Sequence, residues 1–454
     1  MTPLCPKEQD MPPAPDAVTP LEGEICIDAS QLRPGVHVRL PVPWIEHQFM
    51  FNSFVIIDDE QVQLIAAMKL PQLFCDPRRC TVPLPQPGEA PAADDGGGDH
   101  QAQRAVERAA EQQRLAALAA AGIAEKHERS RVMGELRGRL DKAQQHYLSA
   151  ARAVGGAIKG FARNPRESIK QVAEVSAEST AALLADPDSA IVLIAEKAHD
   201  DGHAAHSLSV MTLALLLGKQ AGLPEAALRA LGIGALLHDI GKLAINPAIL
   251  RSDERNRHEE ALYQTHCRCG FEQAARAGSL SQPMLDAILH HHERFDGSGF
   301  PDRQSGSAIP LAARMVAIAN RFDNVVNPVD HRRAMSPSEA LSTMWTREQK
   351  SFDGTLLQLF VRAMGVYPPG SIVQLSDGRV GAVVGSAPAA RPLSPKVLIY
   401  APEVPRRQSI IVDLARDCAL TVERPLRLQE RPAEELDYLL PRRKINWSYL
   451  PAQP

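Results

Sequence analysis

The chain of 454 residues is longer than one compact core accommodates, so we expect two or three domains. A formal net charge of −4 argues against a surface for a nucleic-acid polymer, and 36 Pro and 29 Gly beside 4% aromatic residues indicate linkers between folded parts. Seven scattered Cys do not suggest a disulfide framework, and no stretch approaches the ~20 apolar residues that span a bilayer. We therefore expect a cytoplasmic protein without a membrane span.

The N-terminal part begins with residues 1–23, a Pro-rich stretch without an apolar signal core, which we expect to be a disordered leader. Residues 24–83 alternate apolar with polar or small side chains and predict a small α+β module. Its expected elements are strands at residues 25–27, 36–40, 49–57 and 72–75 and a helix at residues 59–69.

Residues 84–100 are rich in Pro, Gly and Asp and predict a linker, and residues 101–182 predict a helical connector. Apolar side chains recur in the connector at alternating spacings of three and four, at Met133, Leu136, Leu140, Ala143, Tyr147, Ala150 and Val154. This is the a/d stripe of a coiled coil over three heptads, which favours a homodimer through the connector. A helix that packs back on its own chain gives the same stripe, so both alternatives stay open.

Residues 183–368 have a helical apolar pattern, and nine of the 15 His of the chain lie between His199 and His292. After a Pro-Pro-Gly sequence the apolar period changes to two, which predicts a small β appendage over residues 369–425 and leaves residues 426–454 as a charged tail. The predicted fold class is mainly α, with a helical bundle between an N-terminal α+β module and a C-terminal β appendage.

The stretch that points to chemistry is Leu-Leu-His-Asp-Ile-Gly-Lys, where an apolar helical run ends in His238 and Asp239. An imidazole and a carboxylate at the end of a buried helix need a cation or another partner, and a carboxylate can bridge two metal ions. Further imidazoles complete a candidate ligand set of His206, His238, Asp239, His266, His291 and His292. Such a set suits iron, manganese, zinc or nickel inside a helical bundle, although any one of these His alone would be interpreted as a hydrogen-bonded interior residue.

Several segments resemble the HD-GYP family of bacterial metal-dependent phosphohydrolases. They are HS at 206–207, LLHDIGK at 236–242, THCRCG at 265–270, HHERFDGSGFP at 291–301, IPLAARMVAIANRFD at 309–323 and AMSPSEAL at 334–341. The resemblance implies an HD-type all-helical catalytic bundle that hydrolyses cyclic di-GMP to pGpG or GMP. The N-terminal module also looks like the one that often precedes this domain.

The resemblance also assigns roles to individual residues. The six candidate ligands match family metal ligands for two divalent transition metals, with iron or manganese favoured, and Asn320 stands where the family has a second acidic ligand. Lys242 matches the lysine beside the metals, where it would bind a phosphate or protonate the leaving oxygen. The implied substrate-binding residues are Lys242, Gly297, Gly299, Phe300, Pro301 and Arg332. Phe300 replaces the usual Tyr, and Gly202 stands where some members have a Glu for a third metal.

The sequence leaves two functions to compare. The preferred one is a cyclic di-GMP phosphodiesterase, because the six ligands and Lys242 are present, with signalling proteins as further partners. The alternative is a catalytically degenerate regulatory protein that acts by binding a nucleotide or another protein, and Asn320 favours it because its amide carries no charge. A phosphohydrolase for another nucleotide is a third option, against which the DGSGFP segment argues.

Overall fold

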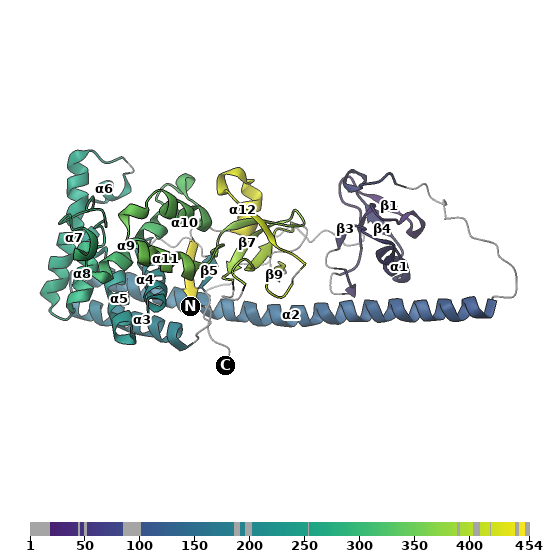
Figure 1. Ribbon diagram of the computed structural model, residues 1–454, viewed down its shortest axis with the longest axis horizontal. Helices are drawn as coiled ribbons and strands as arrows, with labels where there is room; N and C mark the ends of the chain where they lie inside the picture. The colour runs from purple at the N-terminus through teal and green to yellow at the C-terminus, as the bar shows by residue number, and fades with distance from the viewer. Residues whose placement is uncertain are drawn as a thin grey trace, which may run out of the picture. The chain divides into compact units, whose positions relative to one another are not determined.

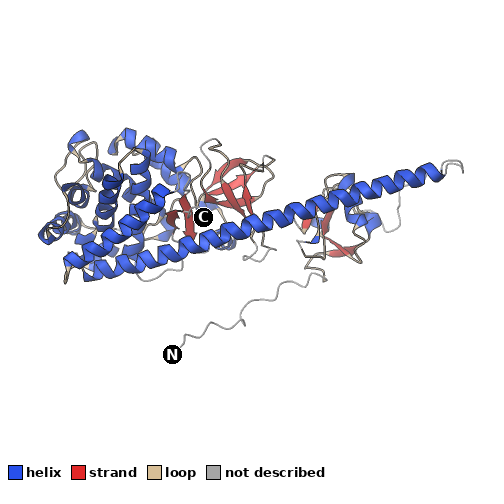
Figure 2. Ribbon diagram, turned by 90° about the horizontal axis from the view of Figure 1, so that it is seen from below, coloured by secondary structure: helices blue, strands red, loops and turns tan. Residues whose placement is uncertain are grey.

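A computed structural model describes residues 19–43, 46–49, 52–84, 101–185, 191–195, 202–252, 254–387, 391–402, 409–417, 419–440 and 445–449. The chain divides into two compact units, Met1–Leu136 and Arg137–Pro454, which are described one at a time. Helices dominate both units (Figures 1 and 2), which confirms the mainly α class. Most of the predicted leader, residues 1–18, and nearly all of the predicted linker, residues 85–100, lie outside the described residues.

The first unit contains an antiparallel four-stranded sheet with the strand order β1-β4-β2-β3. Its strands are β1 Ile25–Ile27, β2 His37–Arg39, β3 Ser53–Val55 and β4 Leu73–Cys75, and its helix α1 is Asp59–Ala67. The helix begins where the Asp58 carboxylate accepts the backbone N–H of Gln61. Val36, Val38 and Ile65 pack in one core between the helix and the sheet. The predicted helix and the four predicted strands are therefore all present, although the strand predicted at residues 49–57 is observed only over Ser53–Val55.

Helix α2 spans Gln101–Gly160, and the apolar stripe of its C-terminal part is covered by the same chain. Ala143, Tyr147 and Val154 are all buried in the second unit. Over these residues the structure favours packing on the same chain, the second of the two alternatives. The side chains of Met133, Leu136 and Leu140 lie outside the described residues.

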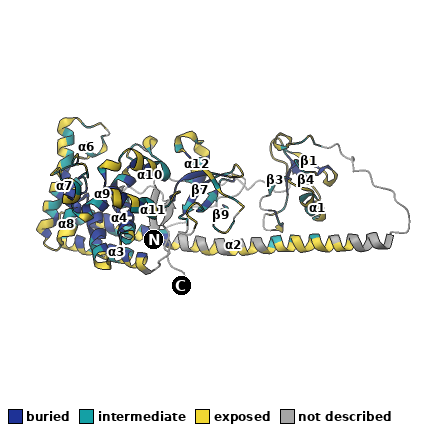
Figure 3. Ribbon diagram, viewed as in Figure 1, coloured by how far each residue is buried: buried dark blue, intermediate teal, exposed yellow. Residues whose placement is uncertain are grey.

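The second unit is built around a bundle of helices. These are α3 Pro165–Ala185, α4 Gly202–Gln220, α5 Glu225–Leu237, α6 Pro247–Arg251, α7 Arg257–Ala277, α8 Gln282–His290, α9 Leu311–Val326, α10 Pro337–Thr346 and α11 Gly354–Met364, with the short 3₁₀ helix η5 at Ile240–Ala244. Helix α5 packs on α3, α4 and α8, while α9 packs on α4 and α8. Figure 3 shows that the inner helices are buried, which agrees with the apolar surface of α4 and α5. No helix among the described residues is long and apolar enough to cross a bilayer.

A seven-stranded sheet follows the bundle, and it differs from the prediction in two places. Its strands are β5 Ile191–Ala195, β6 Ile372–Leu375, β7 Val380–Gly385, β8 Lys396–Ile399, β9 Ile411–Asp413, β10 Val422–Leu426 and β11 Ile445–Tyr449. Strand β5 pairs with β7 and β11, so the region 183–368 is not all-helical. Residues 426–454, predicted as a tail, contain β11 and the helix α12, Ala433–Leu439. A short apolar run such as β5 has no period that separates a strand from a helix.

His37 in β2 is a buried imidazole that the first unit holds in its neutral form. The backbone N–H of Asp76 donates to its Nδ1 over 3.1 Å, so Nδ1 must carry a lone pair, and Nε2 lies 2.9 Å from the Ser53 hydroxyl. Burial and the nearby Arg79 lower the pKa of His37 to about 4. Protonation would place a proton on Nδ1, where the Asp76 amide already donates.

We expect acid to weaken the first unit through His37. In the unfolded chain the imidazole has a pKa of about 6.5, so between this pH and about 4 the unfolded chain binds more protons than the folded chain. The free energy of unfolding therefore falls as the pH falls through this window. Hydrogen exchange of β2 and β4 in the full chain, corrected for intrinsic rates, should become up to roughly tenfold faster for each pH unit within this window. His37→Gln should flatten this dependence, whereas His258→Gln, at an exposed position, should not. Equal pH dependence in both variants would contradict the assignment.

Candidate metal centre

Helix α5 carries the pair His238 and Asp239 into the middle of the bundle. Residues 231–237 are all buried, and His238 and Asp239 are buried directly after them. The chain then turns through η5, where Gly241 lies against the backbone of α7 at His266 and Gly270. A Cβ at Gly241 would overlap the His266 carbonyl oxygen, so glycine is required for η5 to approach α7.

The Asp239 carboxylate lies between two pairs of imidazoles. Its Oδ2 is 3.6 Å from Nε2 of His206 and 3.3 Å from Nε2 of His238. Its Oδ1 is 3.5 Å from Nε2 of His266 and 3.6 Å from Nε2 of His291. Each carboxylate oxygen therefore faces its own pair of imidazole nitrogens.

These separations fit two adjacent metal sites. Ligand atoms that lie about 2.1 Å from one ion at angles of about 90–110° are about 3.0–3.4 Å apart. The first group contains His206, His238 and Asp239, and the second contains His266, Cys267, His291 and His292. Nε2 of His206, His238 and His292 and Oδ1 of Asp239 are buried without a hydrogen-bond partner in the described structure, as expected for atoms that a cation would satisfy.

Hydrogen bonds on the outer side of the rings leave Nε2 as the free acceptor. Nδ1 of His238, His266 and His291 lies 2.7, 2.6 and 2.9 Å from the carbonyl oxygens of Ala235, Tyr263 and Ile288. A carbonyl only accepts, so each Nδ1 must carry the proton, and the lone pair of Nε2 points to the centre. Ring N–H groups bonded in this way are typical of histidine ligands to metals.

The electrostatics of the centre keep its fully buried imidazoles neutral and its carboxylate charged. Burial lowers the pKa of His266 and His291 to about 4 and also lowers the pKa of His238. Burial would raise the pKa of Asp239, but the Lys242 ammonium at 2.6 Å holds that pKa well below its ordinary value. Neutral imidazoles and an ionised carboxylate are the forms that bind cations at neutral pH.

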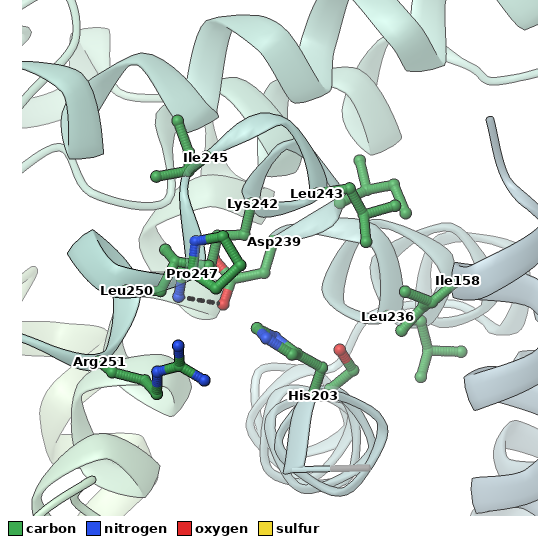
Figure 4. A pocket seen from close by; sticks show the side chains of 12 residues that line it. Ile158, His203, Leu236, Asp239, Lys242, Leu243, Ile245, Pro247, Leu250 and Arg251 are labelled. Atoms are coloured by element: carbon green, nitrogen blue, oxygen red, sulfur yellow. Dashed lines mark hydrogen bonds and ion pairs between the residues drawn. The ribbon is translucent and has the colours of Figure 1, made fainter.

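Lys242 lies directly beside the carboxylate. Its Nζ is 2.6 Å from Oδ2 of Asp239 and 5.6 Å from the centre of the Tyr263 ring. Burial would lower the pKa of Lys242, but the Asp239 carboxylate raises it. Figure 4 shows this ion pair at the wall of a pocket of about 470 Å³.

The signature loop, residues 297–301, places an aromatic ring against the second group of imidazoles. Phe300 stacks on His292 with 4.6 Å between ring centres, and its backbone N–H donates to the His292 carbonyl oxygen. A Cβ at Gly299 would overlap the backbone of Arg294 and His292, and Gly297 has a φ of +81°. The two glycines therefore allow the tight turn that brings Phe300, followed by Pro301, to the ligands.

Two of the predicted site residues have other partners. Asn320 in α9 is buried, and its Oδ1 accepts the side-chain N–H of Asn324 at 2.7 Å. Arg332 has a side chain that is 89% exposed and forms an ion pair with Asp330 at 2.9 Å. Gly202 is the first residue of α4 and offers no ligand.

Sequence reasoning missed Asp323, which lies one turn after Asn320 in α9. Its buried Oδ2 is 2.6 Å from Nδ1 of His206, and its Oδ1 accepts a hydrogen bond from Asn327. Asp323 therefore orients the His206 ring. Backbone carbonyls orient the other three rings that face Asp239, those of His238, His266 and His291. The sequence contained one indication of this role, since Asp323 is a second polar residue, after Asn320, on the buried face of the apolar helix α9.

A third polar group lies beside the centre, at the base of the signature loop. Nδ1 of His290 is 3.8 Å from carboxylate oxygens of both Glu293 and Asp302, and Glu293 accepts the backbone N–H of Asp302. His290 thus faces the loop rather than the Asp239 carboxylate.

Comparison with known proteins places this site in a family. Residues 181–356 match the HD domain family, and residues 24–172 match a domain of unknown function, DUF3391. The HD domain match covers His206, Asp239 and the signature loop. Residues 181–356 of this chain belong to the HD domain family.

Three curated relatives of this chain are phosphodiesterases by name. A cyclic di-GMP phosphodiesterase of Pseudomonas aeruginosa is 32% identical over 245 residues, 53% of this chain and 58% of that protein. A cyclic di-GMP phosphodiesterase response regulator of Xanthomonas campestris pv. campestris is 33% identical over 165 residues, 36% of this chain and 44% of that protein. The 3'3'-cGAMP-specific phosphodiesterase 2 of Vibrio cholerae is 30% identical over 142 residues, 31% of this chain and 27% of that protein. The chain spans about half or less of the length of these relatives.

We expect Asp323→Asn to weaken the candidate metal centre at one site. The change removes the anion beside Nδ1 of His206, and loss of such an outer hydrogen bond costs about 10–100-fold in metal affinity. Metal retained after dialysis against graded chelator, measured by elemental analysis, should show earlier loss of one ion per chain. Asp330→Asn, which removes a carboxylate that pairs with Arg332 outside the two groups of candidate ligands, is the control. Identical metal retention in both variants would argue against the role of Asp323.

Proposed function

We propose that this protein is a metal-dependent phosphodiesterase that hydrolyses cyclic di-GMP to pGpG or GMP. The observation that carries the proposal is the Asp239 carboxylate, whose two oxygens each face a pair of imidazole Nε2 atoms. Two curated relatives with the same HD domain are named as cyclic di-GMP phosphodiesterases. The buried, unpartnered ring nitrogens support a pair of cations rather than a purely structural cluster.

The ligands divide between two cations. His206 and His238 would hold one ion, His266, His291 and His292 the other, and Asp239 would bridge them. Iron or manganese suits this set of imidazoles with a bridging carboxylate. Burial raises the pKa of Cys267 and keeps it as a thiol, which makes its sulfur a poor ligand.

In hydrolysis, a water oxygen bonds to phosphorus while the bond from phosphorus to the ribose 3' oxygen breaks, and that oxygen gains a proton. Two divalent ions, when bound, supply Lewis acidity for the phosphate and a nucleophile from water at neutral pH. Lys242 lies where a phosphate oxygen would approach Asp239. Because its pKa is raised, Lys242 keeps its proton at neutral pH, which favours phosphate binding over proton donation.

The surrounding residues would shape the substrate cleft. Gly297, Gly299 and Pro301 fix the loop, and Phe300 holds His292 by stacking while lacking the hydroxyl of the usual Tyr. Arg332 would reach the substrate only after leaving Asp330, with which it pairs at the surface.

The proposal also covers the partners, the location and the domain boundaries of the protein. We keep a homodimer through the connector, signalling-protein partners and a cytoplasmic location as proposals, together with the predicted domain boundaries. The dimer would use the part of the stripe before residue 137, because Ala143, Tyr147 and Val154 are already buried in their own chain.

We expect Asn320→Asp to increase both metal occupancy and turnover. A carboxylate at this buried position adds an anion to a site for two dications, so the second ion should bind more tightly. Protein purified without oxygen would be assayed for metal content and for cyclic di-GMP hydrolysis. Gln358→Glu, which adds the same charge at an exposed position of α11, is the matched control.

The same assay decides between the enzyme and its degenerate alternative. Two metal ions per chain and turnover that disappears in Asp239→Ala would support the phosphodiesterase. Absence of turnover in the wild type, restored by Asn320→Asp, would contradict the proposal and favour a protein that acts by binding. The relative named for 3'3'-cGAMP makes that nucleotide the competing substrate to include.

A further inference from the structure

A pocket lies directly beside the metal centre and is larger than a phosphate requires. Its volume is about 470 Å³, within the range of ~300–1,000 Å³ typical of ligand sites. Asp239 and Lys242 lie at one side, and Ile158 of α2 and Leu250 and Arg251 of α6 lie at others (Figure 4). The pocket therefore has room for the part of a nucleotide that the metal centre does not hold.

The walls of the pocket are mostly apolar. Seven of the twelve lining residues are aliphatic or Pro, among them Ile158, Leu243, Ile245 and Pro247. Leu243 is 49% exposed, so the structure leaves this apolar surface uncovered. Such walls suit the flat face of a nucleobase, whereas a phosphate between them would lose hydration without hydrogen bonds in return.

Arg251 brings a planar set of donors to this apolar space. It is the last residue of α6, and in Figure 4 its guanidinium points into the pocket, while the dashed line joins Lys242 to Asp239. A guanidinium carries only donors, arranged as a rigid fork. The positive charge for the reacting phosphate is already supplied at the other side by Lys242.

We propose that this pocket is a guanine-binding subsite in which Arg251 reads the base edge. The inference rests on the proposed function and adds to it the source of base specificity. Guanine presents two acceptors, O6 and N7, to such a fork, whereas adenine presents one acceptor and one amino donor at the same edge. The apolar walls hold the face of the base, and Arg251 selects guanine over adenine, by roughly tenfold or more.

The test compares cyclic di-GMP with cyclic di-AMP in the wild type, Arg251→Ala and Arg251→Lys. Affinity is measured by calorimetry and kcat/KM by product formation, with Arg257→Ala, an exposed Arg at the start of α7, as the matched control. Both Arg251 variants should lose roughly tenfold in affinity and kcat/KM for cyclic di-GMP and change far less for cyclic di-AMP. Lys should not rescue, because it keeps the charge but not the fork.

Other outcomes overturn the inference. If Arg251→Ala loses affinity equally for both nucleotides and Arg251→Lys restores it, Arg251 contacts a phosphate instead of a base. If neither variant changes affinity or kcat/KM, Arg251 does not contact the substrate. Wild-type protein that binds cyclic di-GMP without hydrolysing it would contradict the proposed function alone, since the affinity ratio still tests Arg251. Wild-type protein that binds neither nucleotide would overturn the subsite itself.

Discussion

The centre of the second unit depends on one buried carboxylate. Asp239 is 7% exposed and has Lys242 and four imidazoles around its two oxygens. Charge buried in this way is stable only with compensating partners, so the surrounding helices must meet at fixed distances. Helix α5 delivers Asp239, Gly241 lets η5 touch α7, and α8 brings His291 to the opposite side. The helix packing that positions the partners of Asp239 is thus the same packing that sets the geometry of the site.

The imidazoles are oriented in two different ways. His238, His266 and His291 each use the carbonyl oxygen three residues earlier, which the local helical backbone supplies without help from another segment. His206 in α4 instead uses Asp323 in α9, so its orientation depends on tertiary packing. A shift between α4 and α9 would therefore disturb one of the two metal groups first.

The fold elements that depend on local sequence were predictable, and those that depend on contacts between remote segments were not. The module strands, α1 and the strands β6 to β9 follow from apolar periods and turn residues that lie close together in the chain. The strand β5 does not, because its pairing partners β7 and β11 come from remote parts of the sequence. The apolar stripe of α2 likewise fits two kinds of packing, and the burial of Ala143, Tyr147 and Val154 distinguishes them over the described residues.

By itself, the sequence determined the residue types and spacings of the site: the His-Asp pair after an apolar helix, the later imidazoles and the glycines of the signature loop. These are local properties, set by helical period and backbone freedom. Tertiary structure decided which carboxylate oxygen faces which imidazoles, that Asp323 orients His206, that Asn320 is bonded to Asn324, and that Arg251 faces an apolar pocket. Such relations join segments far apart in the chain, and a distance between atoms exists only once the helices have packed.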